Sequence, residues 1–272
     1  MIVNLEILCI GNELLIGKIK DTNAHYLATK ATQLGVNVNR VTVIQDIVEE
    51  IAKTILECVE RKPQFIVTTG GLGPTFDDKT LQGIAQALNC PLEVNAQALE
   101  MVKQRCEEYA AKRHMQTQIE LTASRVKMAT LPKGTQPVNN PLGSAPGVHV
   151  NFGGTILFAL PGVPAEMEAI FAESIAPLFK VVVGGNVFCE RSLFVDGVTE
   201  SHLVPLVDKV MMDNVGVYVK SHPMRSEGKP YLEIHLTMRA TQEQKPVEKL
   251  RKAAKELAVL IEASGGRIQA ES

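Results

Sequence analysis

Two adjacent carboxylates behind a glycine-rich turn are the part of this sequence with the clearest chemical potential. Residues 69–74 read T-G-G-L-G-P, and Asp77 and Asp78 follow shortly after. Glycines allow a ligand to approach the main chain closely, and free amides at the start of a helix bind phosphate. Magnesium is usually held by one or two carboxylates together with substrate phosphates. The stretch therefore predicts a phosphate-binding loop beside a metal site.

The spacing of the glycines separates this loop from two familiar phosphate-binding motifs. No Gly-Lys-Ser/Thr follows the glycines, which excludes a P-loop, and the G-x-G-x-x-G fingerprint of dinucleotide-binding folds is absent. A competing interpretation is a tight turn between a strand and a helix, in which Asp77 and Asp78 only cap that helix.

Polar side chains also follow the first expected strand of the chain. Asn12 and Glu13 come directly after it, and Asp21 and Asn23 precede the next expected helix. Capping of that helix explains Asp21 and Asn23 equally well. Glu13 is harder to explain in this way, because a carboxylate just past a buried strand points to the same sheet edge as the glycine loop.

Two later loops are rich in small residues and could form further walls of the same site. The first covers residues 138–147, and its candidate residues are Asn140, Ser144, Ala145 and Gly147. We interpret it either as a plain turn cluster or as a backbone wall against a ligand. The second is a corner between a strand and a helix that contains Gly162, where Pro164 suits the first helical position.

The apolar pattern predicts the elements that position these loops. Short β-branched runs indicate buried strands, and apolar residues three or four positions apart indicate amphipathic helices. The expected strands are 5–10, 36–45, 65–69, 128–131, 148–152 and 155–160, and the expected helices are 24–34, 47–60, 80–88, 95–114, 116–125 and 165–179. This alternation is typical of a doubly wound α/β sheet, which binds ligands at the carboxyl ends of its strands.

The pattern changes after residue 180 to a smaller α+β unit. Its expected elements, in β-α-β-β-α order, are strand 187–195, helix 200–212, strands 215–220 and 231–239, and helix 243–263. Residues 221–229 are interpreted as a polar connection and residues 266–272 as a frayed tail. The predicted domains are therefore 1–180 and 181–265.

Composition narrows the class of protein. A net charge of −2 and the absence of Trp give no reason to expect a nucleic-acid partner. No apolar run reaches the roughly 18 residues of a membrane span, so no membrane partner is expected. The five cysteines are scattered without a C-x-x-C pair, which predicts reduced core residues of a cytoplasmic protein.

Several motifs together resemble one family. They are G-N-E-L-L at 11–15 with D-T-N at 21–23, T-G-G-L-G-P-T at 69–75 with Asp77 and Asp78, the stretch 140–147, and L-P-G-V-P at 160–164 with Glu166 and Met167. The combination resembles the N-terminal domain of the competence/damage-inducible protein CinA family, which is related to molybdopterin-binding domains of molybdenum cofactor synthesis. The likeness extends over residues 1–180, and the smaller unit is similar to that family's second domain.

The resemblance implies a three-layer α/β/α domain with a mostly parallel sheet, and a homodimer. It also implies an ADP-ribose pyrophosphatase that releases AMP and ribose 5-phosphate. The implied cofactor is a divalent metal, Mg²⁺ or a similar ion, with a monovalent cation as a further candidate. Longer relatives deamidate nicotinamide mononucleotide with an additional domain, and this chain ends before such a domain, so no deamidase activity is expected. Many molybdopterin-binding relatives have Arg-Asp in place of Asp77-Asp78, which favours the CinA branch.

The resemblance and the residue pattern together assign roles at the predicted site. Catalytic and metal-binding roles fall to Asp78, Asp77 and Glu13. Substrate-binding roles fall to Asn12, Asp21, Asn23, Thr69, Gly70, Gly71, Gly73, Asn140, Ser144, Ala145, Gly147 and Gly162. The amides of Gly70, Gly71 and Gly73 are expected to hold phosphate oxygens. Two alternatives stay open, namely pterin binding with adenylyl transfer and a nucleotide-binding module without turnover.

Overall fold

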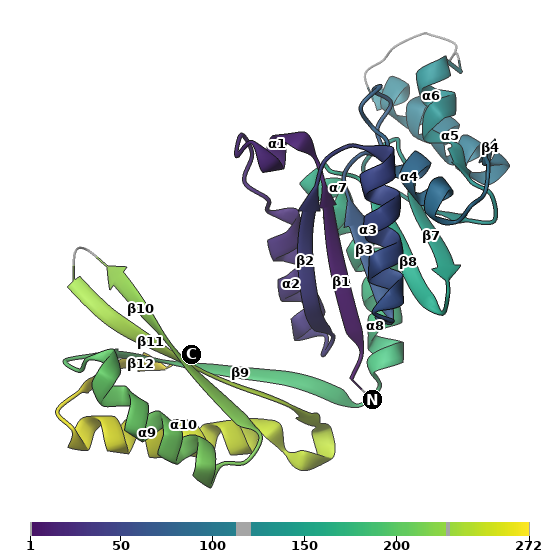
Figure 1. Ribbon diagram of the computed structural model, residues 1–272. Helices are drawn as coiled ribbons and strands as arrows, with labels where there is room; N and C mark the ends of the chain where they lie inside the picture. Colours follow the sequence, from purple (N-terminus) through teal and green to yellow (C-terminus); the bar gives the residue numbers. More distant parts are fainter. Residues whose placement is uncertain (1, 113–120, 227–228, 272) are drawn as a thin grey trace. The chain divides into compact units, whose positions relative to one another are not determined.

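The computed structural model describes residues 2–112, 121–226 and 229–271, which form two compact units (Figure 1). The first unit comprises Met1–Thr32 and Val36–Val183, and the second comprises Gln33–Gly35 and Gly184–Ser272. Among the helices of these residues, none combines the length and apolarity that crossing a membrane requires. The five cysteines are free thiols, and three of them are buried.

A six-stranded sheet forms the centre of the first unit, with the strands in the order β2-β1-β3-β8-β7-β6. Its strands are β1 (Asn4–Ile10), β2 (Asn37–Ile44), β3 (Phe65–Thr69), β6 (Gln136–Val138), β7 (Gly147–Phe152) and β8 (Thr155–Leu160). Neighbouring strands among β2, β1, β3 and β8 pair in parallel. Strand β7 pairs antiparallel with β8 on one side and with β6 on the other. The mostly parallel sheet predicted from the sequence is confirmed.

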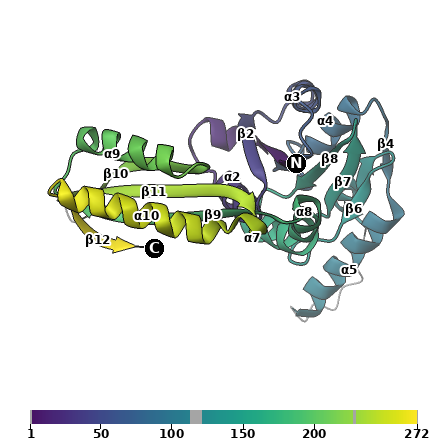
Figure 2. The same ribbon diagram turned by 90° about the horizontal axis from the view of Figure 1, so that it is seen from below.

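Helices cover both faces of this sheet and make a three-layer α/β/α arrangement (Figure 2). Helices α3 (Val48–Glu60) and α4 (Thr80–Ala87) lie on one face, and Leu8 and Ile66 of the sheet pack in the same core. On the other face Phe65 of β3 packs against Phe179 of α8 (Ala176–Val183), with ring centroids 4.6 Å apart. Burial on both faces explains why most residues of β1 and β3 are apolar or β-branched.

The first unit also contains further helices and a separate pair of short strands. They are α1 (Asn12–Leu15), α2 (Asn23–Gln33), β4 (Leu92–Val94), α5 (Ala96–Lys112), α6 (Ala123–Met128), β5 (Thr130–Pro132) and α7 (Pro164–Ile170). A π-helical turn over Phe171–Ile175 joins α7 to α8, so the helix expected over 165–179 continues to Val183. The helix expected over 116–125 lies partly outside the described residues, and Met128 ends α6 where the sequence predicted a strand.

The second unit is an antiparallel sheet with two helices. Its elements are β9 (Asn186–Asp196), α9 (Glu200–Asp213), β10 (Val217–Ser226), β11 (Lys229–Thr241), a 3-10 turn (Gln242–Gln244), α10 (Pro246–Ala263) and β12 (Arg267–Glu271). The sheet order β10-β11-β9-β12 together with this chain order is the β-α-β-β-α-β arrangement of ferredoxin-like folds.

Two predictions for the second unit are wrong. Within the segment expected to be a frayed tail, Arg267–Glu271 form β12, which pairs with β9, because Ile268 packs against the apolar core of this unit. Of the segment expected to be a polar connection, residues 221–226 lie in β10 and Lys229 begins β11, and the other two residues lie outside the described ones. The backbone ladder between these strands continues from Val217 and Met238 to Ser226 and Lys229. A continuous ladder satisfies main-chain groups whatever the polarity of the side chains.

Candidate functional site

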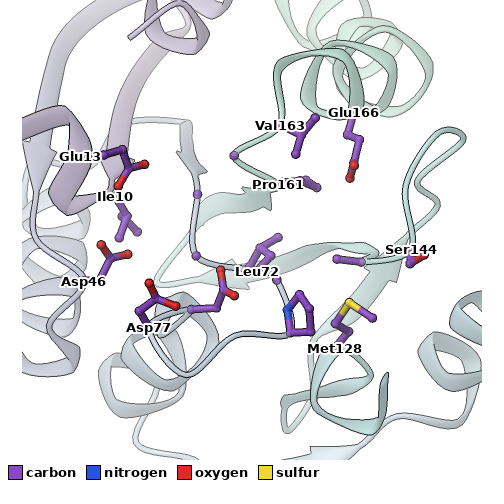
Figure 3. A pocket seen from close by; sticks show the side chains of 17 residues that line it. Ile10, Glu13, Asp46, Leu72, Asp77, Met128, Ser144, Pro161, Val163 and Glu166 are labelled. Carbon is purple, nitrogen blue, oxygen red and sulfur yellow. The ribbon is translucent and has the colours of Figure 1, made fainter. Parts of the chain in front are cut away.

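The carboxyl ends of four neighbouring strands meet at one edge of the first unit and surround a cavity of about 540 Å³ (Figure 3). Strands β1, β2, β3 and β8 are parallel, so the segments that follow them emerge at the same edge. The predicted residues that line the cavity are Glu13, Gly70, Gly71, Gly73, Asp77, Asp78, Ser144, Ala145 and Gly162. The carboxylates that line it are Glu13, Asp46, Asp77, Asp78 and Glu166, and we call it the acid cavity.

The glycine loop, residues 70–74, leaves β3 through two residues in the left-handed region. Gly70 has a φ of 99° and Gly71 a φ of 66°. A Cβ on Gly70 would lie 2.1 Å from the backbone oxygen of Ile10, so no side chain fits between the loop and the end of β1. Thr80, the first residue of α4, closes the loop by donating its hydroxyl to the Gly70 carbonyl at 2.8 Å.

The amides of the glycine loop are only partly available to a ligand. The Gly70 N–H donates to the Leu160 carbonyl at 3.0 Å, so the expectation that it binds phosphate is wrong. The amides of Gly71 and Gly73 enter none of the backbone hydrogen bonds found in the described part of the chain. These two amides are therefore the ones that can receive an anion.

The two adjacent carboxylates hold the turn that follows the glycines. The Asp78 carboxylate accepts hydrogen bonds from the Thr75 amide at 2.8 Å and from the Thr75 hydroxyl at 2.5 Å. The same hydroxyl contacts Asp77, and this hydrogen bond, with a contribution from Lys127, lowers the pKa of Asp77. Helix α4 has no side-chain cap, so the interpretation that Asp77 and Asp78 only cap it is wrong.

Lys127, in the last turn of α6, holds the same turn from another part of the chain. Its Nζ donates to the carbonyl oxygens of Gly73 at 3.5 Å, of Asp78 at 2.9 Å, and of Thr75. Lys127 and Asp78 are 49 positions apart in the sequence. No local motif could have revealed this contact, and the sequence analysis did not find it.

Asp46 completes the acid cavity and was not predicted. It follows β2 and accepts a hydrogen bond of 2.9 Å from the Asn12 amide. Burial raises the pKa of Asp46, and the nearby charges of Glu13, Asp77 and Asp78 raise it further against the effect of that hydrogen bond. In Figure 3 the carboxylates of Glu13, Asp46 and Asp77 gather on one side of the cavity. Its place just past a parallel strand beside β1 was the signal that could have found it.

The donor set suits a hard divalent cation that is shared with a ligand. Carboxylate oxygens are the ligands that Mg²⁺ prefers. Burial is the main cause of the raised pKa of Asp46, and the charges of Glu13, Asp77 and Asp78 add to it. In the described residues no group of three or more His, Cys, Asp or Glu side chains is arranged to hold a metal ion by itself. Magnesium bound by one or two carboxylates and the phosphates of a substrate needs no such preformed cage.

A smaller cavity of about 150 Å³ adjoins the acid cavity and shares Glu13, Gly70 and Gly162 with it. The other predicted residues that line it are Asp21, Asn23 and Thr69. Asp21 accepts a hydrogen bond of 2.9 Å from the Ala24 amide, so capping of α2 is confirmed for Asp21. Asn23 instead donates its amide to the Gly162 carbonyl at 2.9 Å, which ties the start of α2 to the corner after β8.

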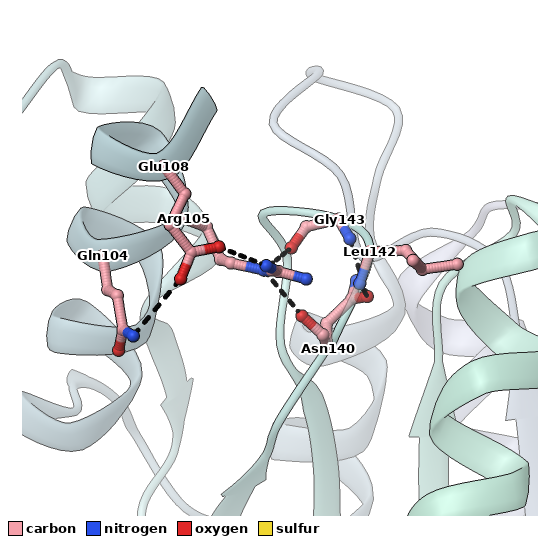
Figure 4. Close-up of polar contacts among 6 residues, drawn as sticks. All are labelled: Gln104, Arg105, Glu108, Asn140, Leu142 and Gly143. Atoms are coloured by element: carbon pink, nitrogen blue, oxygen red, sulfur yellow. Dashed lines mark hydrogen bonds and ion pairs between the residues drawn. The ribbon is translucent and has the colours of Figure 1, made fainter. Parts of the chain in front are cut away.

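Three predicted substrate contacts, Asn12, Asn140 and Gly147, line neither of these cavities. Asn140 is buried, and its side-chain oxygen accepts from the amides of Leu142 at 3.1 Å and Gly143 at 2.8 Å (Figure 4). Gly147 belongs to β7, where it is buried in the sheet. Both residues shape the wall that carries Ser144 and Ala145.

The carbonyl of Asn140 is also held by Arg105 of α5 (Figure 4). The guanidinium Nε of Arg105 donates to this oxygen at 2.9 Å and to the Gly143 carbonyl at 3.3 Å. Helix α5 therefore fixes the backbone of the 140–143 turn from outside, and the wall of the acid cavity is supported by a helix that does not line it.

Comparisons with known proteins agree with this architecture. A protein from Aeropyrum pernix is 41% identical over 266 residues, covering 97% of this chain and 96% of that protein. A protein from Sulfurisphaera tokodaii is 40% identical over 264 residues, covering 97% of both chains. The crystal structure of the protein CinA from Thermoplasma acidophilum, described as of unknown function, is 34% identical, with a TM-score of 0.58 over 65% of this chain and 98% of that one.

The family model described as "probable molybdopterin binding domain" matches residues 6–181. These residues contain the glycine loop, all the carboxylates of the acid cavity, and the six-stranded sheet except for the first two residues of β1. The chain belongs to the family of the probable molybdopterin binding domain.

Proposed function

We propose that this chain is a member of the CinA branch of its family and hydrolyses the diphosphate of ADP-ribose, or of a similar nucleoside-diphosphate sugar, in a metal-dependent reaction. The products are AMP and ribose 5-phosphate. The observation that carries the proposal is the composition of the acid cavity, which places the unused amides of Gly71 and Gly73 beside the carboxylates of Asp77 and Asp78. A diphosphate can bind next to so many carboxylates only if a divalent cation neutralises the repulsion.

The chain's own groups then have separate tasks. Asp77 and Asp78, with Glu13 beside them, face the cation, and the lowered pKa of Asp77 keeps its carboxylate ionised for that purpose. The amides of Gly71 and Gly73 bind phosphate oxygens and stabilise the negative charge that grows on them during hydrolysis. When bound, the metal ion supplies charge neutralisation and a means of activating water.

The ribose side of the substrate would extend toward the smaller cavity. Asp21 and Asn23 line it, and Asp21 Oδ2 and Asn23 Oδ1 are buried oxygens without a hydrogen-bond partner in the described residues. Such oxygens gain stability when hydroxyl groups donate to them. Their position beside Glu13 and Gly70 supports a sugar whose hydroxyls replace the missing donors.

The sequence similarity supports the CinA branch. The 34% identity to the CinA protein of Thermoplasma acidophilum covers almost the whole of that chain. Two alternatives follow from other observations. The family description favours a pterin ligand, and a binding module without turnover would keep the same cavity.

The test is incubation of the protein with ADP-ribose and Mg²⁺, with AMP and ribose 5-phosphate measured by chromatography. We expect both products, their loss on removal of the metal, and at least a hundredfold lower rate for Asp77→Asn. The matched control is Glu60→Gln, an exposed carboxylate on α3 that should leave the rate unchanged. Metal-dependent binding of ADP-ribose without products would select the binding module, and tight binding of a pterin alone would select the other alternative.

A further inference from the structure

A second cavity lies on the other side of the glycine loop. It has a volume of about 460 Å³ and lies among α4, β4, α6 and β5, and we call it the α4–α6 cavity. Figure 1 shows α4, α5 and α6 together at one end of the first unit. The α4–α6 cavity and the acid cavity share Gly71, Leu72, Gly73 and Asp78. The glycine loop is thus a common wall, and one ligand could contact both of its sides.

The chemistry of the two cavities differs sharply. Carboxylates dominate the acid cavity, whereas the α4–α6 cavity is formed mostly by the apolar side chains of Leu81, Leu92, Ala123 and Val126. Among its polar groups, Lys127 Nζ is engaged with loop carbonyls and the Thr130 hydroxyl donates to the Val126 carbonyl at 2.8 Å. The acid cavity therefore favours an anion that is accompanied by a cation. The α4–α6 cavity favours an apolar group.

Gln82 is the polar side chain of the α4–α6 cavity that can still select a ligand. It lies on α4, is half-buried, and its amide takes part in none of the side-chain hydrogen bonds found in the described residues. A carboxamide offers one acceptor and two donor hydrogens on neighbouring atoms. The edge of a heteroaromatic base, with a ring nitrogen beside an amino group, matches that pattern.

We infer that the α4–α6 cavity is the base subsite of the ligand whose diphosphate occupies the acid cavity. The ligand class is a purine nucleotide, with its flat ring between the leucines and Val126 and its polar edge at Gln82. Ligand cavities of this size typically enclose flat apolar groups with a few polar contacts. This inference rests on the proposed function, since it names where the nucleoside of that substrate lies.

The test compares a ligand that has a base with one that has none. Binding of ADP-ribose, inorganic pyrophosphate and adenosine is measured by calorimetry in the presence of Mg²⁺ for the wild type and for Ala123→Phe. Ala123 is the exposed first residue of α6 and lines the α4–α6 cavity, so the added ring enters the space assigned to the base. The control is Ala96→Phe, because Ala96 is likewise the exposed first residue of α5 but lines neither cavity.

We expect Ala123→Phe to weaken binding of ADP-ribose at least tenfold and to leave binding of pyrophosphate within twofold. Ala96→Phe should change neither. Gln82→Ala should weaken the binding of ADP-ribose severalfold and leave the binding of pyrophosphate unchanged. This variant serves as the test if Ala123→Phe does not fold.

Two results separate this inference from the proposed function. If Ala123→Phe and Gln82→Ala both bind ADP-ribose as the wild type does and still hydrolyse it, the base subsite is overturned and the proposed hydrolase activity stands. Binding of adenosine that is lost in Ala123→Phe, without any binding of pyrophosphate, would retain the base subsite and reject the diphosphate site.

Discussion

The side-chain amide of Asn140 donates a hydrogen bond of 2.7 Å to the Glu166 carboxylate, joining the loop after β6 to the start of α7. The same amide donates to the Ala145 carbonyl at 2.8 Å. Gly143 lies so close that a Cβ there would be 2.0 Å from a Glu166 oxygen. One buried side chain therefore sets the wall of the acid cavity that carries Ser144.

Asn140→Ala should lower the free energy of unfolding by about 1–3 kcal/mol, because it leaves two loop amides without their part-buried acceptor and removes a donor from the Glu166 carboxylate. Urea denaturation measures this change. Asn151→Ala, at an exposed position of β7, should stay within about 0.5 kcal/mol of the wild type. Equal losses for the two variants would show that the Asn140 network does not stabilise the fold.

Asp46→Asn should stabilise the metal-free protein and weaken Mg²⁺-dependent binding of ADP-ribose. The pKa of Asp46 is raised in the folded protein, so above its ordinary value its ionisation opposes folding, and at neutral pH the variant removes that opposition. We expect a gain of about 0.5–1 kcal/mol without metal, since the residue is only half-buried. Thermal unfolding with and without Mg²⁺ measures both effects. A variant that is less stable without metal would contradict the crowding of charge at this edge.

Arg61→Met should destabilise the first unit in a pH-dependent way. Burial alone would raise the pKa of Glu6, but hydrogen bonds of 2.8 and 2.6 Å from Arg61 hold it below the ordinary 4.5. A lowered folded-state pKa contributes stability above the ordinary value, and this contribution is lost as the pH falls through the folded-state pKa.

For Arg61→Met we expect a loss of about 3 kcal/mol at pH 7, because Glu6 remains buried without its partner. The loss should become smaller as the pH is lowered from 7 through the folded-state pKa of Glu6, because a protonated carboxyl no longer needs the guanidinium. Denaturation midpoints across this pH range measure the effect. Lys53→Met, which removes the exposed pair with Glu57 on α3, should cost about 0–1 kcal/mol across the same range. A loss for Arg61→Met that does not depend on pH would assign its role to packing.

Lys127→Met should loosen the turn after the glycine loop while the fold persists. The carbonyls of Gly73, Thr75 and Asp78 lose their shared donor, so amide hydrogen exchange should rise at least tenfold over residues 75–79. Lys127→Arg should restore most of the protection, because a guanidinium can reach several acceptors. Lys133→Met, which removes an exposed pair with Glu93, is the control. Unchanged exchange in Lys127→Met would show that Asp78 and Thr75 hold the turn without it.

The sequence was sufficient to predict which loops meet at the edge of the sheet. It was not sufficient to predict which hydrogen bonds each amide and side chain makes there. Apolar runs and helical periodicity located β1, β3, β7 and β8, and the rule for parallel sheets brought Glu13, the glycine loop and Gly162 together. The use of each hydrogen-bonding group depends on contacts distant in the chain. The Gly70 amide is taken by Leu160, and Asn140 is satisfied by Glu166 and its own loop.

The two misjudged segments of the second unit have a similar cause. Residues 221–226 look like a connection because their side chains are polar, and β12 looks like a tail because it is short and terminal. In both cases pairing with a neighbouring strand decides the structure, and the partner strand is not visible from local polarity.

The pairing of β3 with β8 has a consequence for the order in which the protein acquires its shape. Phe65 pairs with Ile156, and the Leu160 carbonyl accepts the hydrogen bond from the Gly70 amide. During synthesis the glycine loop therefore lacks its neighbouring strand β8 until the hairpin of β7 and β8 has been translated. Contacts between such distant segments form slowly because a long loop must close first. The ligand-binding edge should therefore form late in folding. A nascent chain that ends before residue 155 would contain the glycine loop and Asp77 and Asp78, but not strand β8, which holds the Gly70 amide.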